Sequence, residues 1–339
     1  MVYFTILVTK TLTILNLMKK ITLLLFTLCY GLSMQSQIQS KFKKSTLQEF
    51  KGTETVFILS DLYAPEEYEE MLEDTWTVTP YKVVAYDQFK MTDYLDGKHS
   101  FVFIEVEKMT TDKGGKYLYC YLDFVTYNVE AKKKEIAKLR GKSDRKTNIF
   151  SKNQNPILRI MLFPENKFLG KAITGGLSAN TIYNDDVFYT YKPGFLRNFF
   201  QEASNILTEG KEYDMQKDYV KPEITKLQKV TLYMPSYTTI NYNPYLMDAS
   251  TKDEEDKTEL MSKYKYKYEY IDNDELSKKI MNKEDIYYLR FTRVNAWKLI
   301  QVVNAKTGDI VYNSFNAGLN YQLNDGHLKD VSKAVEKGK

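Results

Sequence analysis

Short apolar runs that alternate with helical patterns constrain the fold of this chain more than any other sequence feature. Residues 54–60 (ETVFILS), 81–86 (YKVVAY) and 100–106 (SFVFIEV) have the length and the β-branched and aromatic content of strands. A helix is expected from Pro65, because acidic residues follow in its first turn, where the helix dipole favours them. This alternation predicts an α/β fold with α+β character.

The second half of the chain repeats the order of the first half. The corresponding segments are TETVFILS and QKVTLYMPS, YKVVAYDQF and YKYEYIDNDEL, SFVFIEVE and IYYLRFTR, and DDVFYTYKPGFLRNFFQEASNIL and GDIVYNSFNAG with the helix after it. We therefore expect two similar domains, at residues 45–210 and 226–339. Each would have a mixed sheet with a strand-helix-strand-helix start, a β-hairpin and a C-terminal helix. The alternative is one larger α/β domain.

Further elements are predicted in each half of the chain. Val187–Tyr191 is an apolar run and is expected to be a strand, followed by a helix from Gly194 to about Thr208. Asp272 is expected to cap a helix that begins directly after it.

The N-terminus has the three parts of a secretory signal peptide. Lys19 and Lys20 precede an uncharged apolar run, residues 21–32, and Ser33 and Ser36 offer small residues for cleavage. The run is shorter than the ~20 residues that span a bilayer. Residues 1–36 are therefore expected to be a signal peptide, and the mature chain would keep no transmembrane anchor.

The expected translation start is Met18, which makes residues 1–17 a spurious upstream extension. The alternative is a genuine two-part N-terminal anchor. Cys29 follows Leu28, whereas a bacterial lipoprotein signal has a small residue before its cysteine, so lipidation is not expected. These features predict an exported protein, either periplasmic or extracellular and associated with the outer membrane.

Composition narrows the classes of partner. Signal cleavage removes three lysines and no acid, so the formal net charge falls from +4 to +1. A chain so close to neutral gives no electrostatic reason to expect nucleic acid as a partner. Cys120 would be the one remaining thiol, which leaves no intramolecular disulfide.

No motif in the sequence specifies catalysis, a cofactor or a metal. His99 and His327 are the only imidazoles, and Cys120 lies in the middle of a predicted strand. Too few ligands remain for a Cys/His zinc site, and no phosphate-binding glycine loop is present. We predict structural roles for these three residues, and we expect no catalytic, cofactor or metal site. Glutamate pairs such as Glu66/Glu67, Glu69/Glu70 and Glu105/Glu107 leave carboxylate-based hydrolysis open as an alternative.

The most partner-like feature of the sequence is a basic segment at residues 130–147. A positive helix or loop of this kind suits an acidic partner or an anionic polymer, although a solvated surface is the commoner role. The expected partner-binding patch consists of Lys132, Lys133, Lys134, Lys138, Arg140, Lys142, Arg145 and Lys146. The 28 tyrosines offer a second possibility, a glycan-binding surface, although packing in strands is the commoner use.

Residues 287–312 resemble a known family. The segments YYLRFTR and LIQVV and the turn-and-strand NAKTGDIVY are similar to the strand–strand–hairpin–strand part of TolB-amino-terminal-like domains, which include the curli-export lipoprotein. This chain lacks the lipidation cysteine of that family. The resemblance implies an envelope adaptor or assembly protein. We therefore predict a non-enzymatic envelope module that binds a protein or an envelope polymer.

Overall fold

The computed structural model divides the chain into a unit of residues 1–35 and a unit of residues 36–339. It describes residues 38–40, 42–112, 114–138, 150, 152–175, 178–214, 216–243, 248–318 and 321–338. The predicted signal peptide lies outside these described residues. Both predicted domains, 45–210 and 226–339, fall within the second unit.

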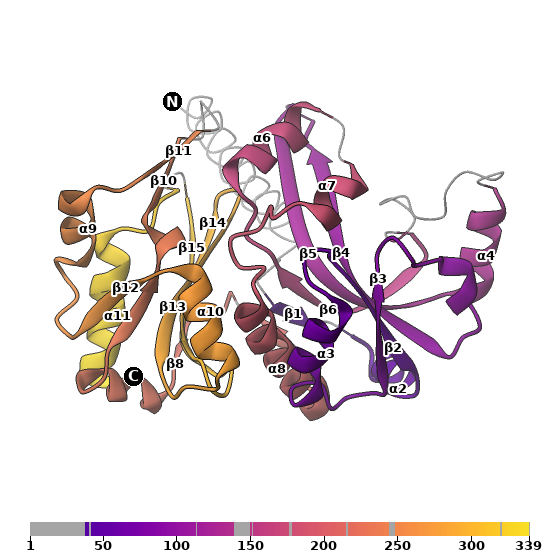
Figure 1. The fold of residues 1–339 in the computed structure, drawn as a ribbon, viewed down its shortest axis with the longest axis horizontal. Coiled ribbons are helices and arrows are strands. Elements are labelled where there is room, and N and C mark those ends of the chain that lie inside the picture. The colour runs from indigo at the N-terminus through magenta and orange to yellow at the C-terminus, as the bar shows by residue number, and fades with distance from the viewer. Residues whose placement is uncertain are drawn as a thin grey trace, which may run out of the picture. The chain divides into compact units, whose positions relative to one another are not determined.

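The first sheet has the strand order β3-β2-β4-β5-β6-β1-β7 (Figure 1). Its strands are β1 (Ile38–Ser40), β2 (Glu54–Leu59), β3 (Tyr81–Ala85), β4 (His99–Thr110), β5 (Lys116–Tyr127), β6 (Gln154–Met161) and β7 (Tyr213–Asp214). β2 runs parallel to β3 and β4, and the other pairings are antiparallel. The central strand β2 reads as an apolar run because both of its faces are buried.

The second sheet has the order β12-β9-β13-β14-β15-β8. Its strands are β8 (Tyr219–Val220), β9 (Leu232–Pro235), β12 (Tyr268–Ile271), β13 (Tyr287–Val294), β14 (Trp297–Asn304) and β15 (Ile310–Ala317). β9 runs parallel to β12 and β13, and the other pairings are antiparallel. A separate antiparallel pair consists of β10 (Ile240–Asn243) and β11 (Asp248–Thr251).

The two sheets share one arrangement of five strands. β3-β2-β4-β5-β6 in the first sheet and β12-β9-β13-β14-β15 in the second have the same order, and their parallel and antiparallel pairings agree. Two large mixed sheets confirm the predicted α/β fold class and are consistent with two similar domains.

One strand prediction is wrong. Val187–Tyr191 forms only an isolated bridge between Phe188 and Pro164. In the shared order of five strands, the position of β15 is taken in the first sheet by β6. Most side chains of this segment are buried without strand pairing, and Tyr189 is half-buried. The Phe188 ring packs against Phe168, with centroids 5.8 Å apart. A short apolar run signals burial, and burial alone does not distinguish a strand from an irregular segment.

The helices connect and cover the strands. The α-helices are α2 (Lys44–Lys51), α3 (Pro65–Glu73), α4 (Val129–Ala137), α6 (Asn166–Thr174), α7 (Ala179–Asn184), α8 (Pro193–Glu209), α9 (Glu254–Met261), α10 (Asn273–Met281) and α11 (Asp325–Lys337). The 3₁₀ helices are η1 (Met91–Tyr94), η2 (Pro222–Gln228) and η3 (Ser236–Thr239). The predicted cap is confirmed, because the Asp272 carboxylate accepts from the first backbone N–H groups of α10.

Helix α8 joins the two halves, since it packs against both sheets (Figure 1). On one side its Phe200 ring meets Phe57 of β2, with centroids 5.4 Å apart. On the other side Asn198 accepts a 3.0 Å hydrogen bond from the Tyr288 hydroxyl of β13. This double burial explains why most residues of α8 are buried, including the polar Arg197, Asn198 and Glu202, whose side chains bind neighbours inside the protein.

Candidate functional site

An open groove of about 660 Å³ lies where the two halves meet. One wall comes from α3 and the segment before it, and the other comes from α10. The start of α8 contributes Lys192 and Pro193. The other lining residues are Tyr63, Glu67, Glu70, Asp274, Ser277, Lys278, Met281 and Asn282. A volume of this size lies within the range of ordinary ligand pockets.

The α3 wall of the groove is acidic. Pro65 begins the helix, and the Glu67 carboxylate caps it by accepting a 3.1 Å hydrogen bond from the Ala64 N–H. Five glutamates lie on α3: Glu66, Glu67, Glu69, Glu70 and Glu73. None of them has a cationic partner among the described residues. Glu67 and Glu70 line the groove. Their negative charge is therefore open to a partner that enters it.

Lys192 connects the halves at the groove. Its ammonium lies 2.9 Å from Asp186 Oδ2 and 3.3 Å from Asp274 Oδ1, and Asp274 belongs to α10. Burial opposes its charge, but the bond to Asp186 and the neighbouring acids outweigh burial and raise the pKa of Lys192. Burial also raises the pKa of the neighbouring Tyr63 to about 12. Near neutral pH this part of the groove therefore carries a fixed ammonium and a neutral phenol.

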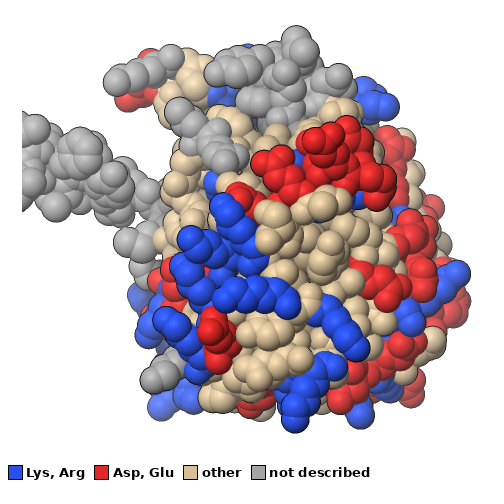
Figure 2. Space-filling model, turned by 90° about the vertical axis from the view of Figure 1, so that its left-hand side faces the viewer, with Lys and Arg blue, Asp and Glu red and all other residues tan. Residues whose placement is uncertain are grey.

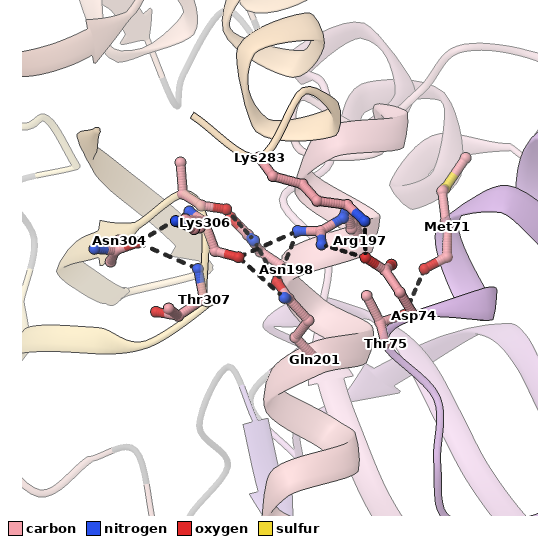
Figure 3. A network of polar contacts seen from close by, with 11 residues as sticks. Met71, Asp74, Thr75, Arg197, Asn198, Gln201, Lys283, Asn304, Lys306 and Thr307 are labelled. Carbon is pink, nitrogen blue, oxygen red and sulfur yellow. Dashed lines mark hydrogen bonds and ion pairs between the residues drawn. The ribbon is translucent and has the colours of Figure 1, made fainter. Parts of the chain in front are cut away.

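A polar network near the groove fixes the two halves to each other (Figure 3). Asp74, just after α3, pairs with Arg197 of α8 at 2.9 Å and with Lys283, which follows α10. Burial alone would raise the pKa of Asp74, but these two cations lower it. Further along α8, the Asn198 amide donates a 2.9 Å bond to the Ala305 carbonyl in the turn before β15. These contacts therefore hold the two walls of the groove in place relative to each other.

The predicted basic patch is only partly on the surface. Lys132 is a correction, because its side chain is buried and cannot contact a partner. Its ammonium pairs with Glu135 at 3.2 Å and donates to the Lys152 carbonyl at 2.6 Å. Three lysines are exposed: Lys133, Lys134 and Lys138. The remaining four residues, Arg140, Lys142, Arg145 and Lys146, lie outside the described residues.

A second group of lysines was missed by the sequence analysis. Lys329, Lys333 and Lys337 lie four residues apart on α11, which places them along one face of the helix. Two ion pairs, Lys263–Asp325 and Lys265–Glu336, bring further lysines beside that helix. Figure 2 shows Lys and Arg side chains gathered on part of this side of the molecule, with acidic groups above and to the right. The four-residue spacing was the available signal.

Five of the buried tyrosines, Tyr68, Tyr127, Tyr183, Tyr191 and Tyr237, bind the protein's own backbone. The Tyr183 hydroxyl donates to the Ile104 carbonyl and accepts from the Ile104 N–H, at 3.0 Å each. The Tyr237 hydroxyl accepts from the Phe291 N–H at 3.1 Å, and that of Tyr127 donates to the Phe150 carbonyl at 2.7 Å. These phenols satisfy backbone groups of inner strands and of residues outside the strands. These tyrosines therefore have a structural role.

Of the glutamate pairs, Glu105 alone takes part in a buried carboxylate cluster. Arg159 lies 3.4 Å from Glu105 Oε2 and 2.6 Å from Asp123 Oδ1, and Glu107 is 3.9 Å away at the edge. Burial and a hydrogen bond to Glu105 raise the pKa of Asp123 well above its usual range, although Arg159 opposes this shift. None of these residues lines the groove between α3 and α10.

The two histidines and Cys120 have structural contacts. His99 lies 2.8 Å from Asp96 and 3.3 Å from Glu54. His327 and Asn324 form a reciprocal capping box at the start of α11. Cys120 is fully buried, and burial raises its pKa. In the described ranges, no group of three or more His, Cys, Asp or Glu residues is placed to hold a metal ion.

His327 should make the stability of the protein depend on pH. Its pKa is lowered from 6.5 to about 4, mainly by burial and then by Lys298. The stabilising contribution of the neutral ring is therefore complete above pH 6.5 and is lost as the pH falls through 4. In H327Q the capping geometry is kept, because glutamine suits the N3 position of a capping box.

At pH 7.5 we expect H327Q and the wild type to unfold at similar denaturant concentrations. At pH 4.5 the variant should be more stable by about 1–2 kcal/mol, after allowance for solvent screening of a partly exposed ring. Urea titrations at the two pH values measure this difference. A difference that does not change with pH would contradict the assignment.

Comparisons with protein-family models, with curated proteins and with solved structures find no match for this chain. No helix within the described residues is both long enough and apolar enough to cross a membrane.

Proposed function

We propose that this chain is an exported envelope protein that binds a partner protein in the groove between α3 and α10. Export is proposed from the signal-peptide features of residues 19–36, with the protein acting in the periplasm or outside the cell at the outer membrane. The proposed role is binding or assembly, in line with the resemblance of residues 287–312 to envelope domains. The observation that carries the binding proposal is the open groove with one unneutralised acidic wall.

The charge of the groove favours a basic partner. Glu67 and Glu70 face it without a cationic partner among the described residues, whereas Asp274 is already paired with Lys192. Lys278 also lines the groove, on the α10 wall, and it has no ion pair with another described residue. A lysine- or arginine-bearing segment of a partner protein would neutralise this excess of acid. An envelope polymer is the alternative occupant.

Charge reversal of the acidic wall tests the proposal. We expect E67K/E70K to weaken partner capture at least tenfold, because like charges would then face the basic segment. The matched control is E69K/E73K, on the same helix, since Glu69 and Glu73 lie near Tyr81 of β3 and do not line the groove. The control should capture the partner within about twofold of the wild type, a difference below ~0.5 kcal/mol.

The measurement is photo-crosslinking in intact cells. In one variant a photoreactive amino acid replaces Asn282, which is exposed and lines the groove. In a control variant of the same protein it replaces Asn180 of α7 instead. Crosslinked protein is then identified by mass spectrometry. One envelope protein captured from position 282, and lost in E67K/E70K, is the expected result. Capture of polysaccharide alone, or equal capture by the reversed variant, would overturn the proposal.

A further inference from the structure

A second cavity lies beneath the segment that connects the two halves. Its volume is about 360 Å³, which suits a ligand of one or two small rings. The connecting segment lines the cavity through Tyr213 and Tyr219. In this segment β7 pairs with the first sheet and β8 pairs with the second sheet. The lining residues are Glu202, Asn205, Ile206, Glu209, Tyr213, Tyr219, Lys221, Gly308, Asp309 and Ile310.

The charges around this cavity cancel. Glu202 is paired with the fully buried Arg290 at 3.1 Å, and Asp309 is paired with Lys221 at 3.5 Å. Glu209 is paired with Lys211 at 3.2 Å. Each acid of the lining therefore already has a cation, and the cavity has no excess charge that would attract an ionic ligand.

The cavity nevertheless offers polar groups and aromatic surface. Arg290 binds Oε2 of Glu202, and no described residue donates to the other oxygen of this carboxylate, which is only 8% exposed. The exposed Asn205 side chain likewise has no partner among the residues described. The hydroxyls of Tyr213 and Tyr219 bind each other, and their rings pack edge to face, with centroids 6.4 Å apart.

We infer that this cavity is a binding site for a neutral polyhydroxylated ligand of the size of a monosaccharide. Hydroxyl groups of such a ligand can donate to the open Glu202 oxygen and can bond the Asn205 amide in either direction. Its C–H faces can pack on the two tyrosine rings. A ligand here would contact α8, the connecting segment and the turn before β15, and would therefore brace both halves. This site is separate from the groove and does not depend on the proposed function.

Saturation-transfer NMR with a matched set of sugars tests the inference. The neutral probes are glucose, galactose, mannose and N-acetylglucosamine, the cationic probe is glucosamine and the anionic probe is glucuronate. We expect at least one neutral sugar to bind with a Kd of about 0.1–10 mM, and to bind at least fivefold more tightly than either charged sugar. Binding of no neutral sugar at 20 mM, or preference for a charged one, would overturn the inference.

Two variants locate the binding. N205L removes the amide from the cavity at an exposed position, and Y219L removes one of the two aromatic rings. Each should weaken sugar binding at least fivefold. The control N180L makes the same change at an exposed asparagine of α7, and should leave the Kd within twofold of the wild type. Unchanged binding in both N205L and Y219L would place the sugar elsewhere and overturn the site.

Discussion

Replacing Gly194 by valine should lower the free energy of unfolding by about 3 kcal/mol or more. A Cβ atom at this position would lie 2.5 Å from the Ser277 carbonyl oxygen and 2.8 Å from the Ser277 Cα. Both are backbone atoms of α10, so no side-chain rotation relieves the clash and the two helices must separate. The Gly194 N–H also donates a 2.9 Å hydrogen bond to Ser277 Oγ, which this separation would lengthen.

Thermal and urea unfolding measure this effect, and the melting temperature should fall by roughly 6 °C or more. The control is G52A, because a Cβ at Gly52 has ordinary contacts of 3.4 Å or longer and its φ of −86° suits any residue. The control should change stability by no more than about 0.5 kcal/mol. An unchanged midpoint for G194V would mean that α8 and α10 do not pack this closely.

Removing Glu202 should destabilise the protein more than removing its partner Arg290. In E202M the guanidinium stays charged and buried without an anion, at a cost of about 3–5 kcal/mol. In R290M the carboxyl can bind a proton, because burial already raises the pKa of Glu202 to about 7 while Arg290 opposes the shift. A neutral acid is tolerated in the core far better than an unpaired cation.

Urea titrations at pH 8.5, where Glu202 of the wild type is ionised and paired with Arg290, compare the three variants E202M, R290M and E202M/R290M. The double variant should be at least about 2 kcal/mol more stable than E202M, because it buries no charge at this position. For the wild type, the stabilising contribution of protonated Glu202 is greatest below pH 4.5 and is lost as the pH rises through 7. Equal costs for the two single variants at pH 8.5 would contradict this account.

Local patterns in the sequence were enough to place most of the strands and helices along the chain. Residues 54–60 and 286–294 formed the inner strands β2 and β13, because their length and side-chain types fit strands. The two sheets are consistent with the repeated order of segments, except that β6 and not Val187–Tyr191 corresponds to β15. Asp272 was readable as a cap because capping is a local interaction between residues close in sequence.

The tertiary structure alone decided where the cavities and the buried charges lie. The groove needs α3, α8 and α10 together, and nothing in the sequence near Glu67 names Asp274 or Lys278 as its neighbours. Lys132 looked like a surface cation, yet Glu135, the Lys152 carbonyl and the Tyr127 ring hold it inside. The physical reason is that burial and electrostatics depend on distances between segments far apart in sequence, whereas periodicity and capping depend on neighbours within a few residues.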